Sequence, residues 1–241
     1  MKKLLPEDLS ALSASCLFKG WDEKILRSLL LKDVCRMEGY EASETVFLTG
    51  DKVGDMGLVI SGRLRIQREG FDGSLSIIGE VAAGDLFAEA FVCAGIESMP
   101  VSVWTVEPSE ILFIDYVRML TLSSDSGSGM SLAGQTFVRN LLQITVNKLL
   151  FMNRKIEILS KATTREKLMA YLEQLAEQQE KRGFRENTRA EKEKSFPIPL
   201  KRQELADFLG VNRSALSREI GKMQREGIVE FSKNAFKLRR R

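Results

Sequence analysis

The spacing of apolar residues changes twice along this 241-residue chain, and those changes limit the fold more than any other feature. In residues 7–32 the apolar residues recur at three- and four-residue steps, which predicts helices. Within residues 34–115 the apolar residues occur in short runs separated by glycines, such as 45–48 and 111–114. From Leu132 onward they recur every three or four residues. Many short runs predict an antiparallel barrel, roll or sandwich, whereas the pattern from Leu132 onward again predicts helices. We therefore expect an α+β protein whose β-rich part precedes a helical part.

The long apolar pattern between residues 132 and 159 has two stripes. One repeats every seven residues, which is the spacing that a two-stranded coiled coil requires. We expect this stripe to form a dimer interface and the other to pack on the chain's own β-rich part. The alternative is one buried helix of a monomer. The first stripe holds Leu142, Leu149 and Ile156 with Val146, Met152 and Leu159 between them, and the second holds Phe137, Leu141, Ile144 and Phe151.

The residues that the chain lacks exclude several functions. It has no histidine, the commonest metal ligand and general base. Its cysteines, Cys16, Cys35 and Cys93, are dispersed and fall short of the four thiolates of a typical iron–sulfur cluster. We therefore expect no catalytic residues, no metal and no cofactor. No apolar run reaches the roughly 18 residues that span a bilayer, and the N-terminus has no signal peptide, so a cytoplasmic protein without a membrane partner is expected.

Charge is unevenly distributed along the chain. Residues 1–160 carry a net charge of −5 and residues 161–241 one of +8, which together give the overall charge of +3. A basic C-terminal third indicates that this end binds a polyanion. The alternative is a chance distribution of surface charge.

The segment 201–238 has the pattern of a helix-turn-helix followed by a hairpin. A short amphipathic helix begins near Lys201, Gly210 permits a sharp turn, and Asn212 can cap the next helix. The apolar positions 228–231 and 235–238 predict a small β-hairpin, or wing. In such a unit the second helix enters the major groove of DNA with its first residues toward the bases.

The polar face of that second helix is basic. An arginine fork matches guanine O6 and N7 in the major groove, so we expect this face to contact bases and phosphates. Arg213 could instead pair with an acid on its own helix, but neither Glu219 nor Glu226 lies three or four positions away. The DNA-binding residues that we expect are Arg213, Ser214, Ser217, Arg218 and Lys222 on the second helix, with Lys201 and Arg202 at the start of the first; Arg239, Arg240 and Arg241 are expected near phosphates.

The segment 200–218, LKRQELADFLGVNRSALSR, resembles the DNA-binding motif of the Crp/Fnr family of bacterial regulators, and the similarity extends over nearly the whole chain. The resemblance implies an antiparallel β-roll (a double-stranded β-helix or jelly-roll), a long dimerisation helix and a C-terminal winged helix-turn-helix. It also implies a homodimer that binds an inverted-repeat operator in double-stranded DNA, with RNA polymerase as a further partner, as in a transcription activator. The turn signals that follow the family's order are Gly50-Asp51, Ser61-Gly62, Asp72-Gly73 and Gly84-Asp85 before Leu86-Phe87.

The recognition helix matches the family in part. Cyclic-AMP-binding members have the form Arg-Glu-x-x-x-Arg, in which Arg213 and Arg218 match both arginines while Ser214 replaces the glutamate. In the oxygen-sensing branch a Ser-Arg pair ends the reading motif, and Ser217-Arg218 matches it. That branch also has clustered N-terminal cysteines, which this chain lacks.

The sensor part departs further from the family. The family's phosphate cassette has a Gly-Glu pair and, about ten residues on, an Arg-Ser pair. Ala88-Glu89 stands at the first pair and Met99-Pro100 at the second, so these four residues are the expected effector site. Glu89 could accept a ribose hydroxyl, but neither Met99 nor Pro100 can neutralise a phosphate. Cyclic AMP bound in the family's usual way is therefore not expected.

The primary hypothesis is a homodimeric, sequence-specific DNA-binding transcription regulator controlled by an unidentified small molecule. The alternatives are a thiol-based redox sensor acting through the cysteines, an enzyme with a nucleotide-binding regulatory domain, and a regulator that has no ligand. The residues of the last third form no catalytic constellation, which disfavours the enzyme. The expected regions are an effector-sensing β-roll over 1–130, a dimerisation helix over 131–160 and a winged helix-turn-helix over 161–241.

Overall fold

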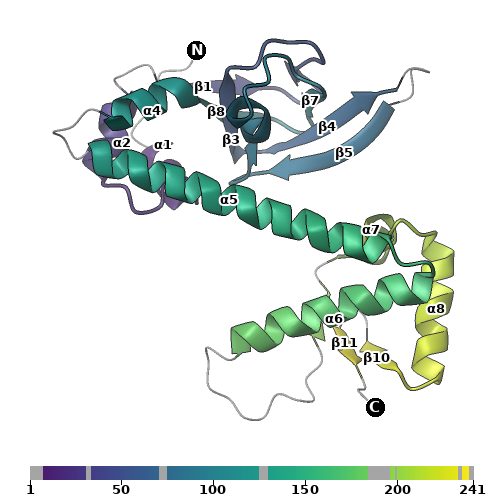
Figure 1. The fold of residues 1–241 in the computed structure, drawn as a ribbon. Helices are drawn as coiled ribbons and strands as arrows, with labels where there is room; N and C mark the ends of the chain where they lie inside the picture. Colours follow the sequence, from purple (N-terminus) through teal and green to yellow (C-terminus); the bar gives the residue numbers. More distant parts are fainter. Residues whose placement is uncertain are drawn as a thin grey trace. The chain divides into compact units, whose positions relative to one another are not determined.

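The structure is a computed structural model, and it describes residues 8–30, 34–70, 75–124, 130–183, 196–198, 200–232 and 235–238. The chain forms two compact units, residues 1–147 and 148–241. The 30-residue helix α5 (Met130–Leu159) contributes to both. Figure 1 shows it as the longest helix drawn.

The first unit contains two antiparallel four-stranded sheets. Their strand orders are β1-β8-β3-β6 and β2-β7-β4-β5. The two sheets enclose one apolar core, and helices pack on the outer face of the first sheet over a second core. The elements are α1 (Asp8–Ala14), α2 (Glu23–Leu30), β1 (Cys35–Tyr40), β2 (Thr45–Phe47), β3 (Asp55–Ser61), β4 (Arg63–Glu69), β5 (Leu75–Ala82), β6 (Leu86–Phe87), α3 (Glu89–Cys93), β7 (Ser102–Thr105), β8 (Ser109–Asp115) and α4 (Tyr116–Ser124).

Strand β8 explains why its sequence is continuously apolar. Ile111 and Phe113 point into the core between the two sheets, whereas Leu112 and Ile114 point into the core under the helices. Successive side chains of a strand face opposite sides, so a strand that is covered on both sides needs apolar residues at every position. This is the predicted antiparallel β-roll, and the α+β fold is confirmed.

Gly62 makes the tight connection between β3 and β4. Its φ is +87°, a left-handed conformation that side chains rarely adopt. A Cβ at this position would also overlap the hydroxyl of Ser109 and the carbonyl of Pro108. The Ser61-Gly62 signal therefore has a steric cause. The predicted Asp72-Gly73 turn lies outside the described residues, although β4 and β5 pair as the hairpin that flanks it.

One face of α5 anchors it to the first unit. Phe137 and Leu141 are buried in the core under the helices, and Ile144 packs against it, as predicted. The side chain of Asn140 donates hydrogen bonds to the carbonyls of Leu17 and Lys19, both at 2.9 Å. The prediction for Phe151 is wrong: this residue lies beyond the first unit and is 55% exposed. Its ring lies 6.1 Å from that of Phe208 in the second unit.

The second unit is a helical domain with a three-stranded antiparallel sheet, ordered β10-β11-β9. One apolar core joins its helices and sheet. The predicted helix-turn-helix and hairpin are present, while the turn at Lys233-Asn234 lies outside the described residues. The elements are α6 (Thr164–Gly183), β9 (Phe196–Pro197), α7 (Arg202–Leu209), α8 (Arg213–Arg225), β10 (Val229–Ser232) and β11 (Ala235–Leu238).

Among the described residues, no helix has the length and apolar character needed to cross a membrane.

Candidate nucleic-acid interface and effector-binding residues

The turn between α7 and α8 is set by two residues. Gly210 ends α7 with φ at +60°, and its N–H donates to the carbonyl of Asp207 at 3.1 Å. Asn212 then caps α8, because its side-chain oxygen accepts from the N–H of Ser214 at 2.9 Å. The chain therefore leaves one helix and starts the next with three residues between them.

Buried apolar residues hold the two helices against the rest of the unit. Leu205 and Leu209 of α7 are at most 1% exposed, as are Leu216, Ile220 and Met223 of α8. On α8 these residues follow the helical repeat and form one stripe. The opposite face of α8 is thereby turned to solvent, and the predicted contact residues lie on it.

Arg165 of α6 links α6 to α8. Its guanidinium donates to Glu219 at 2.5 Å and to both carboxylate oxygens of Glu226 at 2.7 and 3.1 Å. Hydrogen bonds from Arg165 lower the pKa of Glu226, and they raise the pKa of Arg165 itself. Glu219 of α8 and Glu226, which follows the last residue of α8, are therefore both held by Arg165, and neither pairs with Arg213.

The exposed face of α8 is basic. Arg213, Arg218 and Lys222 are exposed, and no salt bridge is found for them among the described residues. Arg218 makes one long hydrogen bond, from Nε to the carbonyl of Ser214 at 3.4 Å. Ser214 and Ser217 are exposed beside these side chains. All five residues predicted on α8 thus lie on its solvent side.

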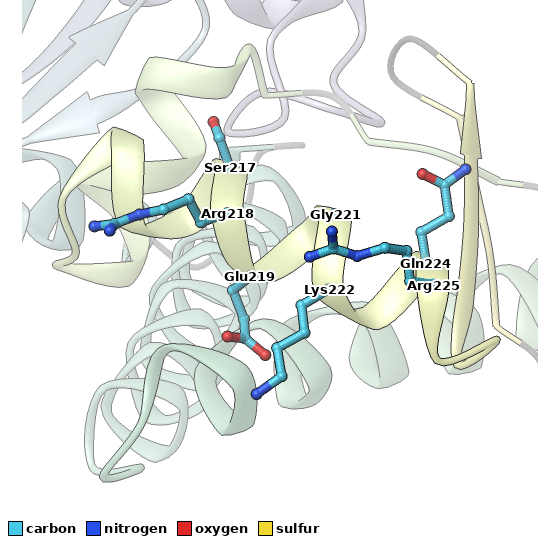
Figure 2. Close-up of a pocket in the computed structure, with 7 residues that line it drawn as sticks. All are labelled: Ser217, Arg218, Glu219, Gly221, Lys222, Gln224 and Arg225. Atoms are coloured by element: carbon cyan, nitrogen blue, oxygen red, sulfur yellow. The ribbon is translucent and has the colours of Figure 1, made fainter.

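A shallow hollow of about 580 Å³ runs along this face (Figure 2). Four of its lining residues, Glu219, Gly221, Gln224 and Arg225, were not predicted from the sequence. The signal that could have found the last three is their spacing, since each lies three, four or seven positions from Ser217 or Arg218. The lining residues are Ser217, Arg218, Glu219, Gly221, Lys222, Gln224 and Arg225.

The two residues predicted at the start of α7 have different surroundings. Lys201 is exposed, and its backbone N–H donates to Glu204 at 2.7 Å. The guanidinium carbon of Arg202 lies 5.7 Å from the ring centres of both Phe231 and Phe236 in the wing. Burial, followed by the nearby charge of Arg213, lowers the pKa of Arg202. Arg202 therefore stacks on the wing, while Lys201 is open to solvent. Residues 239–241 lie outside the described residues.

The seven-residue stripe of α5 is exposed. Large apolar side chains on a protein surface mark interaction sites when they form one continuous patch. The exposed fractions are 62% for Leu142, 42% for Val146, 58% for Leu149, 52% for Met152, 64% for Ile156 and 38% for Leu159.

The four candidate effector residues lie close to the core of the β-roll. Ala88 and Met99 belong to the apolar core between the sheets, and Met99 is only 1% exposed. Glu89 begins α3 and is 6% exposed, after Ala88 in a left-handed conformation with φ at +60°. Pro100 is exposed. The structure therefore brings Ala88 and Met99 together but leaves Pro100 on the surface.

Arginines of β4 do not replace the missing phosphate clamp. Arg65 pairs with Glu80 at 3.0 Å, and Arg63 pairs with Glu107 at 3.3 Å. The apolar side chain between them, Leu64, points into the roll, so strand alternation turns both arginines outward. Arg68 is also exposed.

Three phenylalanine rings lie close together in the roll interior. Phe47, Phe87 and Phe113 lie 6.0 to 6.3 Å apart between ring centres. The guanidinium carbon of Arg36 lies 4.5 Å from the centre of the Phe113 ring, and the same guanidinium pairs with Glu38 and Asp55. The interior is therefore largely apolar at the described positions, and the one cation that the structure places against these rings is already paired with acids.

Two family models match the chain. Residues 37–126 match the cyclic nucleotide-binding domain, and residues 166–241 match the Crp-like helix-turn-helix domain. The chain is 22% identical over 204 residues to the transcriptional activator protein FnrL of Cereibacter sphaeroides, covering 83% of this chain and 74% of the relative. It is 24% identical over 195 residues to the electron transport regulator A of Shewanella oneidensis, covering 81% and 71%.

Solved structures share the fold. CLP, a c-di-GMP-responsive global regulator of Xanthomonas campestris, aligns with a TM-score of 0.53 at 21% identity, over 91% of this chain and 100% of that one. CprK in complex with OCPA aligns with a TM-score of 0.62 at 13% identity, over 89% and 91%. The chain thus shares its fold with both proteins.

Proposed function

Because this chain belongs to the Crp/Fnr family of DNA-binding transcription regulators, we propose that it binds inverted-repeat DNA as a homodimer through α8 of each protomer. The observation that carries this proposal is the exposed basic face of α8, whose arginines are not paired with the acids of their own helix. Because its buried apolar face holds α8 in place, the basic face can enter the major groove without rearrangement.

Arg213 and Arg218 are the proposed base readers. They lie five residues apart, which corresponds to a rise of about 7.5 Å and a rotation of roughly 500°. They therefore face within about 140° of each other and can address neighbouring base pairs from one groove position. We assign a guanine to each, and a phosphate or a base edge to Ser214 and Ser217.

Lys201 and Lys222 are the proposed phosphate contacts. Both are exposed, and a lysine ammonium binds a phosphate as a point charge without geometric demands. Arg202 is also assigned to a phosphate, but unlike the two lysines it contacts the wing. Its guanidinium stacks on Phe231 and Phe236, so it would orient the wing toward the same DNA strand.

The proposed dimer forms along the exposed stripe of α5. Leu142, Leu149 and Ile156 repeat every seven residues and are each more than half exposed, which suits a two-stranded coiled coil. A second copy of the chain is the occupant that the repeat favours, because a seven-residue spacing matches an identical helix in parallel. Two α8 helices would then meet half-sites about one helical turn apart.

The β-roll is the proposed sensor of a small molecule. Glu89, Ala88, Met99 and Pro100 remain the candidate contacts, with Glu89 as the polar group and Met99 as an apolar wall. An interior lined by Phe47, Phe87 and Phe113, against which the guanidinium of Arg36 is already paired with acids, favours an uncharged or largely apolar effector. Native mass spectrometry of gently purified protein tests this proposal. A retained effector adds mass to the dimer, whereas a bare dimer that still selects its operator favours a regulator without a ligand.

A thiol-based redox sensor is the second candidate function. Burial raises the pKa of Cys35 to about 12, and burial also raises that of Cys93, so both thiols react slowly at neutral pH. The three cysteines are free. Replacing all three with alanine and measuring operator binding under oxidant and reductant separates the candidates. Unchanged binding supports the small-molecule sensor, and a lost response to oxidant supports the redox sensor.

The remaining assignments follow from this role. We propose RNA polymerase as a partner and activation as the outcome, supported by the relative named as a transcriptional activator. The proposed activity is binding without a catalytic step, and the proposed location is the cytoplasm, where the chromosome is. Fluorescence anisotropy tests the central assignment: a selected operator should bind about 10³-fold more tightly than a shuffled duplex. Equal affinity for both would reject sequence-specific binding.

A further inference from the structure

Gly221 stands in the interior of α8, where a glycine has no structural reason to be. Glycine weakens a helix interior relative to alanine because it loses more conformational freedom on folding. A Cβ built at Gly221 meets no atom within 4 Å, so neither packing nor a left-handed backbone requires glycine there. The other common reason for a glycine is the close approach of something else to the backbone.

The neighbours of Gly221 indicate what approaches. Ser217 and Arg218 lie one turn before it, and Gln224 and Arg225 lie one turn after it, so these four residues border a patch with Gly221 at its centre (Figure 2). The patch is the middle of the shallow hollow on α8. A side chain at position 221 would project into open space at this patch.

The charge of this patch favours a polyanion. Arg218, Lys222 and Arg225 surround Gly221, and no salt bridge is found for them among the described residues. Glu219 and Glu226 direct their hydrogen bonds to Arg165, although the charge of Glu226 is also felt by Lys222 and Arg225. Arg218 and Arg225 lie seven positions apart, which corresponds to a rise of about 10.5 Å along the helix.

The dimensions of DNA make a missing side chain useful here. The major groove is about 12 Å wide, and a helix with its side chains is about 10–12 Å across. A helix therefore enters the groove fully only where the side chains that face the groove wall are small. Gly221 supplies such a gap, one turn after the base-reading Arg218 and one turn before Arg225, whose guanidinium can reach a phosphate.

We propose that a sugar-phosphate strand of the operator passes directly over Gly221, in contact with the backbone of α8, with Arg218 and Arg225 on either side. Gly221 is then a positioning residue that sets how deeply α8 enters the groove, and Gln224 and Arg225 extend the interface by one turn. This inference rests on the proposed function, since it takes DNA as the partner of α8.

The experiment is a size series at one position, Gly221→Ala and Gly221→Leu, measured for thermal stability and for operator binding. Alanine is the better helix former, so Gly221→Ala should raise Tm by a few degrees. The same variant should bind the selected operator about tenfold more weakly, and Gly221→Leu more weakly still. Loss of phosphate contacts should also flatten the slope of log K against log salt by about one unit.

A matched control is Gly54→Ala, which adds the same methyl group in open space within the first unit. It should leave operator affinity unchanged. If Gly221→Ala and Gly221→Leu bind the operator as tightly as the wild type, the inference is overturned while the proposed function stands. A wild type that shows no preference for the selected operator would instead overturn the proposed function, and this inference with it. Intact DNA binding with lost transcription activation in the Gly221 variants would assign the patch to a protein partner.

Discussion

The guanidinium of Arg165 grips the carboxylate of Glu226 with two hydrogen bonds, although 61 positions separate the two residues in the chain. The same guanidinium also donates a hydrogen bond to Glu219, which lies seven positions before Glu226. These contacts fasten α8 to α6 and withdraw two negative charges from a helix that otherwise presents basic side chains. The structure thereby separates the acids of α8 from the face that we assign to DNA.

Removing Arg165 should weaken DNA binding without changing its sequence preference. Arg165→Gln leaves the carboxylates of Glu219 and Glu226 unpaired beside Lys222 and Arg225, where they repel phosphates. We expect an affinity roughly three- to tenfold lower for operator and shuffled duplexes alike, measured by anisotropy at low salt. Adding Glu226→Gln should restore part of the loss. An equal loss in the double variant would mean that Arg165 acts only by holding the fold.

The contact between Arg165 and Glu226 should also make the free energy of unfolding depend on pH. Hydrogen bonding to Arg165 lowers the pKa of Glu226 below its unfolded value of about 4.3. A lowered folded pKa stabilises the native state above the unfolded pKa, and this stabilisation is lost as pH falls through the folded pKa. The difference in unfolding free energy between wild type and Glu226→Gln should therefore be larger at pH 7 than at pH 3. A difference independent of pH would contradict this contact.

Local signals made much of the DNA-binding unit predictable. Asn212 caps α8 through a bond that spans two residues, so the sequence alone reveals it. The spacing of Leu216, Ile220 and Met223 likewise gives the buried face, and the opposite face follows. By contrast, the stacking of Arg202 on Phe231 and Phe236 depends on how the hairpin folds back. No spacing rule reports such a contact.

Other features could not be predicted, because the element is too short to show a pattern or because the contacting residues are far apart in the sequence. Helix α3 has 5 residues and β9 has 2, too few to show a period. Phe151 lies on a face that the spacing identified correctly, but spacing does not tell which unit covers that face. The pairing of Arg165 with Glu226 joins separate helices. The presence of Met99 where the family has an arginine indicated that the phosphate clamp is missing, whereas the burial of the Met99 side chain in the roll core came only from the structure.

Charges in the exposed stripe of α5 should dissolve the dimer. Leu149→Lys with Ile156→Lys would place four ammonium groups in the seam of a dimer, which is strongly unfavourable. Sedimentation at micromolar concentration should find the wild type as a dimer and the variant as a monomer that has lost operator binding. Asn147→Lys is the control, since Asn147 is exposed on α5 about 140° from Leu142. A monomeric wild type that still selects an inverted repeat would contradict the assignment.

Cyclic AMP should not bind to the β-roll. Met99 is buried in the core, Pro100 offers no hydrogen-bond donor, and Arg63 and Arg65 are paired with glutamates outside the roll. Arg36, which lies against the Phe113 ring, is already paired with Glu38 and Asp55, so a phosphate in this interior would lack a free counter-charge, which is costly. Calorimetric titration at physiological nucleotide concentrations should therefore give no heat of binding. Saturable binding that disappears in Met99→Ala, but not in Arg63→Ala, would show that the roll accommodates the nucleotide in another way.

The most direct test of the DNA-binding account is a selection of bound sequences from random duplex DNA, run in parallel with wild type and Arg218→Ala. The wild type should enrich an inverted repeat with half-site centres about one helical turn apart. Arg218→Ala should keep that arrangement and lose the preference at one base pair of each half-site, at a cost of roughly 1–3 kcal/mol for that base pair. Lys201→Ala should keep the whole motif and bind it more weakly. An enriched motif that is unchanged in Arg218→Ala would contradict the account, because Arg218 would then not read bases from α8.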